Sequence, residues 1–240
     1  MTRSLPRTLP RAAAAPAPDN ARRRLGLQTR ERVMEAAAGL LLRGSVSAMS
    51  ISDVVRLAGV PASSIYWHFG SKEGLVAAVA AAAVERWLAS LPDPAILPAT
   101  GEARVLAGIA AVTDALAQDA RAVTLVTKVG MELGVGTHSG IDVVRRARAD
   151  VVRYGVRLFT PAFKALSHAH ARAAAERMTV LLMATADGIA VNAATLGRGA
   201  AAENDYQVLG ELAVLLYRNE AEVRVRNPSS RKPKAQLRTK

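Results

Sequence analysis

The most constraining feature of this 240-residue sequence is the stretch Ser50–Leu75, SISDVVRLAGVPASSIYWHFGSKEGL. Gly59 supplies the backbone freedom that a sharp turn requires, and Pro61 has a fixed φ that suits the start of a new helix. Apolar residues with helical spacing flank this turn: Ile51, Val54, Val55 and Ala58 precede it, and Ile65 and Phe69 follow it. A Ser at position 50 or 52 can begin the first helix, and Gly70 ends the second. The stretch predicts two short helices joined by a tight turn.

The rest of the sequence predicts further helices, so we expect an all-α fold. Half of the residues are hydrophobic but only 4% are aromatic, and Ala, the strongest helix former, is abundant. Apolar periodicity and breakers predict helices over 29–43, 61–69, 71–88, 102–118, 121–133, 141–159, 167–196 and 203–222. A Gly-rich loop is expected over 134–140.

The basic residues are concentrated at the two ends of the chain. Residues 1–27 hold six Arg and one Asp, and residues 224–240 hold seven basic and no acidic residues, which together account for the net charge of +12. Neither end has an apolar face, so both are expected to be disordered. Such segments attract polyanions, nucleic acid first and anionic membrane second, although the C-terminal one could equally be a solvated tail.

The outward face of the second helix has the chemistry of a DNA reader. With Ile65 and Phe69 pointing inward, this face presents small, hydroxylated and aromatic side chains: Ala62, Ser63, Ser64, Tyr66 and Trp67. The major groove of B-DNA admits one helix and exposes base edges and the thymine methyl group to it. A supporting helix, a turn and a reading helix form the layout of a helix-turn-helix domain.

The run AGVPASSIYWHFGSKEGL, with the supporting helix before it, resembles the DNA-binding domain of the TetR (tetracycline-repressor-like) family. The resemblance covers about residues 28–88, which include a connector helix after the reading helix. It implies an N-terminal three-helix helix-turn-helix domain, followed over residues 102–223 by a larger helical domain for effector binding and dimerisation. It also implies DNA contacts by Ser50, Ala62, Ser63, Ser64, Tyr66, Trp67, His68 and Lys72.

Some of these positions have structural alternatives: Trp67 could pack against the supporting helix, His68 could be a hydrogen-bonded structural residue, and Lys72 could be merely solvated. The reading face also lacks an Arg that could form a bidentate contact with guanine, which is worth ~1–3 kcal/mol of discrimination. Residues 28–75 have five basic and four acidic side chains, although phosphate neutralisation supplies much of DNA affinity. We therefore expect Arg22, Arg23 and Arg24 to act as an arm on the DNA.

The resemblance implies a homodimer formed by the last two helices as a four-helix bundle. Apolar and small residues with helical spacing are the candidates for this interface: Leu181, Thr185, Gly188, Leu209, Leu212 and Leu216. A single large core in one chain could also bury this surface.

The intervening helices would enclose a pocket for a small-molecule effector. Candidate lining residues combine apolar bulk with isolated polar groups: Trp87, Met131, His138, Met183 and Asn192. The two Met could instead be plain core and His138 a loop residue, and Asp187 is expected to cap or pair at the dimer interface rather than bind a ligand.

With these features, the resemblance implies a dimeric transcriptional regulator, a repressor that binds a palindromic operator and is released by an effector. Activation is an alternative, as is an architectural DNA binder without an effector. The sequence contains no Gly-x-Ser-x-Gly elbow, zinc helix or phosphate loop, so no enzyme, catalytic residue, cofactor or metal site is expected. The absence of Cys suits a reducing cytoplasm, and the resemblance implies a bacterial, nucleoid-associated protein. The longest apolar runs are expected to be too polar to span a membrane.

Overall fold

The computed structural model describes residues 18–134, 140–197 and 203–226, and within these ranges it contains helices and no strand. The all-α prediction is confirmed. The α-helices are α1 (Pro18–Arg43), α2 (Ile51–Ala58), α3 (Ala62–Phe69), α4 (Lys72–Ser90), α5 (Gly101–Gln118), α6 (Arg121–Gly134), α7 (Ile141–Phe159), α8 (His168–Thr195) and α9 (Val208–Arg226). Three short 3-10 helices are η1 (Pro94–Ile96), η2 (Thr160–Phe163) and η3 (Glu203–Gln207). The first two were not predicted, and η3 occupies the start of the helix predicted over 203–222.

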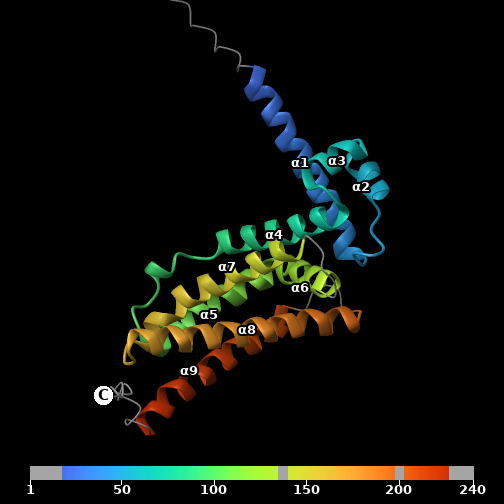
Figure 1. Cartoon of the computed structure of the whole chain (residues 1–240). Coiled ribbons are helices and arrows are strands. Elements are labelled where there is room, and N and C mark those ends of the chain that lie inside the picture. Colours follow the sequence, from blue (N-terminus) through green and yellow to red (C-terminus); the bar gives the residue numbers. More distant parts are fainter. Residues whose placement is uncertain (1–17, 135–139, 198–202, 227–240) are drawn as a thin grey trace, which may run out of the picture.

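Helices α1–α3 form a small head at one end of the molecule, and α4 runs from the head into a body built by α5–α9 (Figure 1). One buried cluster begins in the head and continues through α4 into α6 and α7; it includes Val33, Ile65, Leu75, Val129 and Val144. A second cluster fills the body between α5, α7, α8 and α9. Because the first cluster crosses the boundary, the head is packed directly on the part of the body that α6 forms.

Local caps explain why the head folds as the sequence predicts. The Ser50 hydroxyl accepts the Asp53 N–H at the start of α2, and Gly59 ends that helix with φ of 63°. Gly70 ends α3 with φ of 74°, and the Ser71 hydroxyl accepts the Gly74 N–H to begin α4. These are the residue types that favour helix ends.

Helix α1 is longer than the sequence predicted, and its first half projects from the body (Figure 1). The prediction that residues 1–27 are disordered is wrong for residues 18–27, and Thr29 is inside the helix rather than its cap. Leu25 and Leu27 are 63% and 55% exposed, so neither of these apolar side chains anchors this half to the body. Its helix-forming residues, with Pro and Asp in the first turn, account for it. Residues 1–17 lie outside the described part of the chain.

Helix α9 begins and ends later than the predicted helix over 203–222, because residues 203–207 form the 3-10 helix η3. It continues to Arg226, so the expected disordered tail of residues 224–240 is wrong for its first three residues. Residues 227–240 lie outside the described part of the chain.

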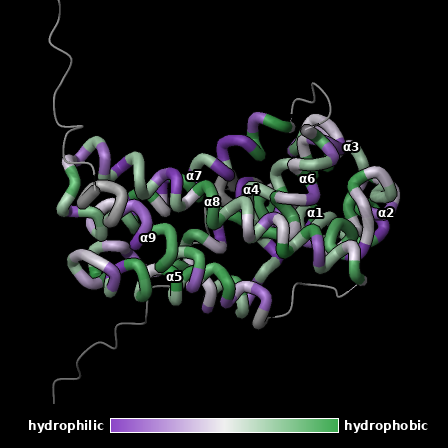
Figure 2. Tube along the Cα trace, turned by 90° about the horizontal axis from the view of Figure 1, so that it is seen from below, coloured by the Kyte–Doolittle hydropathy of each residue, from purple (hydrophilic) through white to green (hydrophobic). Residues whose placement is uncertain are grey.

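Two segments, Lys72–Ile96 and His168–Thr195, are long and apolar enough to cross a membrane by length and composition alone. The expectation that such runs are too polar is therefore wrong on hydropathy. Both α4 and α8, however, are core helices: α4 buries Leu75, Val76 and Val79, and α8 buries residues such as Met178. Figure 2 shows hydrophobic and hydrophilic residues alternating along the helices, as expected when each buries one face.

At the end of the body away from the head, a buried arginine hydrogen-bonds three segments of the chain together. Arg104 on α5 is 4% exposed, and its guanidinium donates to the carbonyl oxygens of Leu158, Pro98 and Pro94 at 2.6, 2.8 and 2.8 Å. These bonds tie the end of α7 to the Pro-rich connection after α4.

Candidate nucleic-acid interface and internal cavity

The outward face of α3 is held open to solvent by two inward residues. Ile65 is completely buried, and Phe69 is half-buried beneath the Arg30 guanidinium, whose carbon lies 5.5 Å from the ring centroid. On the opposite side, Tyr66 is 49% exposed and Trp67 is 80% exposed. Monomeric proteins seldom leave a Trp this open, so the α3 face has the surface of a binding element.

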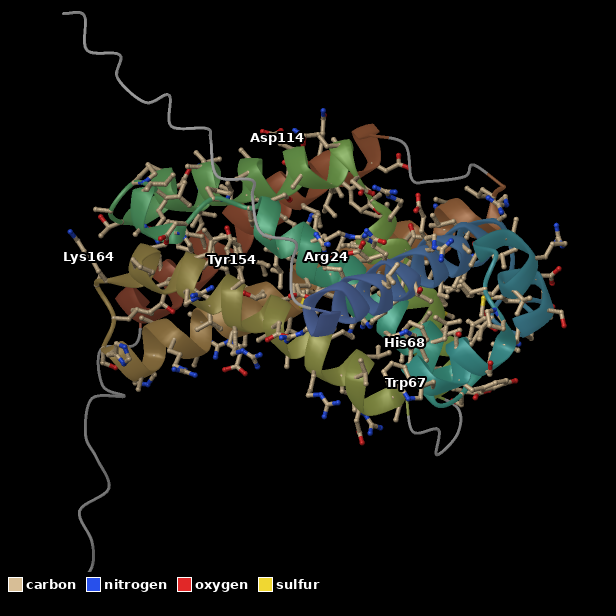
Figure 3. The ribbon with its side chains drawn as sticks, turned by 90° about the horizontal axis from the view of Figure 1, so that it is seen from above. Arg24, Trp67, His68, Asp114, Tyr154 and Lys164 are labelled. Atoms are coloured by element: carbon tan, nitrogen blue, oxygen red, sulfur yellow. The ribbon has the colours of Figure 1, made fainter. Side chains whose placement is uncertain are left out.

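Trp67 and His68 lie together at the head end of the molecule, far from Lys164 at the other end (Figure 3). Their rings are in edge contact with centroids 4.6 Å apart, and His68 is half-buried. The alternative that Trp67 packs against the supporting helix is wrong, because its side chain is open to solvent. Of the remaining candidates on α3, Ser63 is exposed, and Ala62 and Ser64 are half-exposed.

The two predicted phosphate contacts outside α3 are already engaged within the protein. The Ser50 hydroxyl donates to the Asp53 carboxylate at 2.6 Å as well as capping α2. That hydrogen bond, followed by the one from Arg56, lowers the pKa of Asp53 below its ordinary value of 3.8. Lys72 is half-buried and its Nζ donates to the Ser47 carbonyl at 3.2 Å, so it is not merely solvated. DNA contact by either residue stays a prediction.

The basic residues before the head occupy a helix rather than an extended arm. Arg23 and Arg24 are exposed on the first half of α1, which projects from the body (Figure 1); Arg24 is labelled in Figure 3. Arg22 belongs to the same helix, but its side chain lies outside the described part. A helix fixes the direction of these charges, whereas a disordered arm would not.

A set of polar contacts that the sequence did not predict joins α6 to the connection between α1 and α2. The Glu132 carboxylate accepts the N–H groups of Val46 and Ser47 at 2.9 and 3.1 Å. One turn earlier, Lys128 Nζ donates to the carbonyls of Leu41 and Gly44 at 2.7 and 2.8 Å. We call Lys128 and Glu132 the α6 latch. Their spacing of four residues places them on one helix face, which was the only signal available in the sequence.

The body contains a partly open apolar cavity of about 80 Å³ between α4, α5, α6, α7, α8 and α9. Its wall includes Val84 and Trp87 from α4, Ala122, Val123 and Val126 from α6, Tyr154, Gly155 and Leu158 from α7, and Thr179, Leu182, Met183 and Ala186 from α8. Gly155 allows a close approach of α7 to α8, because a Cβ there would collide with the Thr179 side chain.

One ion pair stands in this wall. Arg148 on α7 pairs with Asp187 on α8, and the Thr127 hydroxyl on α6 donates to the same carboxylate at 2.7 Å. Asp187 therefore pairs within one chain and not at the expected dimer interface; that it binds no ligand stays a prediction.

The structure places some of the predicted effector residues at the cavity and others away from it. Trp87 and Met183 line the cavity. Met131 and Asn192 do not: Met131 is 59% exposed, and both line an open groove between α6 and α8, so their assignment to an internal pocket is wrong. Helical spacing alone could not tell which side of α6 or α8 faces inward. His138 lies outside the described residues.

Some of the residues predicted for the dimer interface are exposed, and others are buried within the chain. Leu181 and Gly188 are exposed on α8, and Thr185 is half-exposed with its hydroxyl bonded to the Leu181 carbonyl. Leu209 is only 1% exposed, so its assignment to an interface is wrong: it is part of the chain's own core. Leu212 and Leu216 are half-buried against that core. Further exposed apolar residues on these two helices include Val180 and Val191 on α8 and Val208 and Leu215 on α9.

Comparisons with known proteins match the head and the first part of α4. Residues 33–79, from α1 to α4, match the family model described as bacterial regulatory proteins, tetR family. Over 52 residues the chain is 38% identical to two proteins of Pseudomonas putida, the HTH-type transcriptional regulator TtgR and the probable HTH-type transcriptional regulator ArpR. Each match covers 22% of this chain and 25% of the relative, so the chain spans about a quarter of the length of these relatives.

The whole fold is similar to solved structures of low sequence identity. A transcriptional regulator of the TetR family from Agrobacterium tumefaciens has a TM-score of 0.57 at 16% identity, covering 79% of this chain and 97% of that one. A TetR transcriptional regulator from Legionella pneumophila has a TM-score of 0.56 at 16% identity, covering 77% and 95%. These likenesses establish the fold. The named relatives are regulators and not enzymes, in line with the sequence, which has no catalytic motif.

Proposed function

We propose that this chain, whose residues 33–79 match the family model described as bacterial regulatory proteins, tetR family, is a dimeric transcriptional repressor of that family, which leaves a palindromic operator when a small molecule binds its body. The observation that carries this proposal is the open face of α3, with Trp67 80% exposed, inside the segment that matches the family model. We place its activity in the bacterial cytoplasm, on the nucleoid.

In the proposed complex α3 lies in the major groove. Ala62 can meet a thymine methyl group, and Ser63 and Ser64 can hydrogen-bond several bases. Tyr66 and His68 donate to phosphate oxygens, as does Lys72, and these contacts fix the register without reading sequence. Ser50 reaches the backbone only by sharing its hydroxyl with Asp53.

The projecting half of α1 supplies the charge that α3 lacks. Arg23 and Arg24 are exposed there, and Arg22 would extend the same basic helix towards the DNA. Because each neutralised phosphate adds to the salt dependence of binding, this helix would provide much of the affinity that does not depend on sequence.

Dimerisation would use the outward faces of α8 and α9. The exposed residues Val180, Leu181, Gly188 and Val191 follow one another at helical spacing on α8, and Leu215 is exposed on α9. An isologous contact of these two helices with their copies makes a four-helix bundle. Two heads would then read two half-sites that mirror each other.

The cavity and the α6 latch offer a route from effector to head. At about 80 Å³ the cavity is smaller than the ~300–1,000 Å³ of sites for drug-sized ligands. A larger effector must therefore push the surrounding helices apart. Ala122, Val123 and Val126 put α6 in the cavity wall, and Lys128 and Glu132 bind the same helix to the head. The effector would favour the arrangement in which the cavity is wide and the heads are displaced.

Selection of bound fragments from bacterial genomic DNA, followed by footprinting, tests this proposal. We expect an enriched palindrome protected on two half-sites, and a complex of two chains with one operator by light scattering. An unenriched library, or protection of a single half-site by a monomer, would contradict the proposal. A Lys164→Ala variant, altered at the end away from the head, should bind unchanged and serves as the control.

A further inference from the structure

The open groove between α6 and α8, whose wall α7 completes, lies beside the cavity; we call it the α6–α8 groove. It has a volume of about 580 Å³. Val126, Arg148 and Asp187 line both the groove and the cavity. These three residues therefore form a common wall, with the groove on one side of it and the cavity on the other.

The polar part of this wall is an ion pair that joins α7 to α8. Arg148 Nη1 donates to Asp187 Oδ1 at 3.3 Å, and Nη2 donates to Oδ2. The Thr127 hydroxyl on α6 donates to the same carboxylate at 2.7 Å. The side chains of Arg148 and Asp187 are 34% and 24% exposed, so solvent reaches the pair. The pair therefore closes the wall between three helices while remaining accessible from outside.

A second groove, between α4, α7 and α8, also adjoins the cavity, but the wall there is packed. The residues that line both this groove and the cavity are Val84 and Tyr154, which are only 3% and 6% exposed. Val84 belongs to the apolar core, and the Tyr154 hydroxyl donates to the Pro92 carbonyl at 2.9 Å. A molecule entering here would have to displace close-packed side chains, which have little room to move.

The ion pair, in contrast, can open without the movement of a helix. Arg148 has a long side chain that can rotate into the α6–α8 groove, where its guanidinium stays hydrated. Asp187 keeps the Thr127 hydroxyl and gains water from the groove, so neither charge is left buried and alone. Ion pairs that solvent reaches add little net stability, so this pair separates at a lower cost than two packed helices.

The α6–α8 groove also gives apolar molecules an approach to the pair. Met131 on α6 and Val191 on α8 line the groove and are 59% and 38% exposed. Ile141, at the start of α7, lines it as well. An apolar molecule gains free energy when it leaves water for such a surface. From there it reaches the ion pair.

We propose that the α6–α8 groove is the entrance to the cavity and that the Arg148–Asp187 pair is its gate. The molecule that passes is compact and largely apolar, because the cavity is lined mainly by aliphatic and aromatic side chains. The inference rests on the proposed function only in taking this molecule to be the effector. It also links entry to the head, because Thr127, which holds Asp187, precedes Lys128 of the α6 latch.

Exchange of fluorobenzene, followed by fluorine-19 magnetisation-transfer NMR on the full-length protein, tests the gate without DNA. Benzene is known to enter an engineered apolar cavity of about 150 Å³. Arg148→Ala removes the guanidinium, and Asp187→Asn removes its charged partner but keeps an acceptor for Thr127. Arg153→Ala is the matched control, because Arg153 lies on the same helix and pairs with Asp150 in the wall of the second groove.

We expect Arg148→Ala to raise the association and dissociation rates together, each at least about fivefold, and Asp187→Asn to raise both by less. The dissociation constant should stay nearly the same, because a gate speeds entry and exit alike. Arg153→Ala should leave both rates unchanged. Asp187→Asn provides the test on its own should Arg148→Ala fail to fold. Wild-type rates in the folded gate variants, faster exchange in Arg153→Ala, a change confined to the dissociation rate, or no binding of fluorobenzene would overturn the inference.

The outcome is separable from the proposed function. Binding to the selected palindrome is measured on the same preparations without fluorobenzene. A protein that binds the palindrome but exchanges fluorobenzene at the wild-type rate in both gate variants refutes the gate alone. Gated exchange in a protein that selects no palindrome refutes the proposed function alone.

Discussion

The α6 latch makes a prediction that can be worked from its geometry. Glu132→Ala removes the acceptor from two backbone N–H groups, those of Val46 and Ser47. A hydrogen bond to a charged group is worth ~1.5–3 kcal/mol. Val46 N is partly buried and Ser47 N is exposed, so we take the lower figure for the first and about half of it for the second. The free energy of locally opening the connection between α1 and α2 should therefore be about 2 kcal/mol lower in this variant than in the wild-type protein.

Amide hydrogen exchange measures this directly. A difference of about 2 kcal/mol corresponds to roughly 30-fold faster exchange, which should appear at Val46 and Ser47 and not in α8. Glu132→Gln keeps an acceptor but removes the charge, so its effect should be intermediate. Asp114→Ala, an exposed change on α5 (Figure 3), is the control. Unchanged exchange at both amides in Glu132→Ala would show that α6 does not hold the head.

Three further predictions concern other parts of the molecule. Arg104→Met leaves the carbonyls of Leu158, Pro98 and Pro94 without their donor, and should lower the free energy of unfolding in urea by at least ~3 kcal/mol. The pKa of Asp53 is lowered chiefly by the Ser50 hydroxyl, so Ser50→Ala should raise this pKa towards 3.8 in an NMR titration. Because the pKa of Asp53 is lower in the folded than in the unfolded protein, the stability that this hydrogen bond provides is fully present above pH 3.8. It disappears as the pH falls through the pKa of the folded state. Replacing Arg23 and Arg24 by Ala should reduce the slope of log K against log salt by about 1 for each phosphate that is no longer neutralised, and an unchanged slope would show that α1 does not reach the DNA.

Much of the fold could be predicted because its signals are local. The head follows from apolar spacing and from caps at Ser50, Gly59 and Gly70, and α7 has the predicted bounds of 141–159. The first half of α1 was missed because it has no apolar face, and a search for a buried stripe cannot find a helix supported by propensity alone. The short 3-10 helices have too few residues to show a period.

The sites were harder to predict because they depend on which side of a helix is covered. Leu209 was assigned to the dimer interface and Met131 to the cavity, yet the first is buried in the chain's own core and the second faces solvent. Both positions fit a helical stripe, and only the packing of neighbouring helices separates inside from outside. The α6 latch joins residues 84–87 positions apart, a distance over which sequence spacing carries no information.

The central claim is that the open face of α3 reads DNA, and the affinity of a Trp67→Ala variant for the selected palindrome tests it most directly. Trp67 is 80% exposed, so its removal should leave the melting temperature unchanged. Fluorescence anisotropy with the palindrome and with a scrambled duplex should then show affinity for the palindrome reduced at least about tenfold, and non-specific affinity changed much less. Wild-type affinity for the palindrome in this variant would contradict the account.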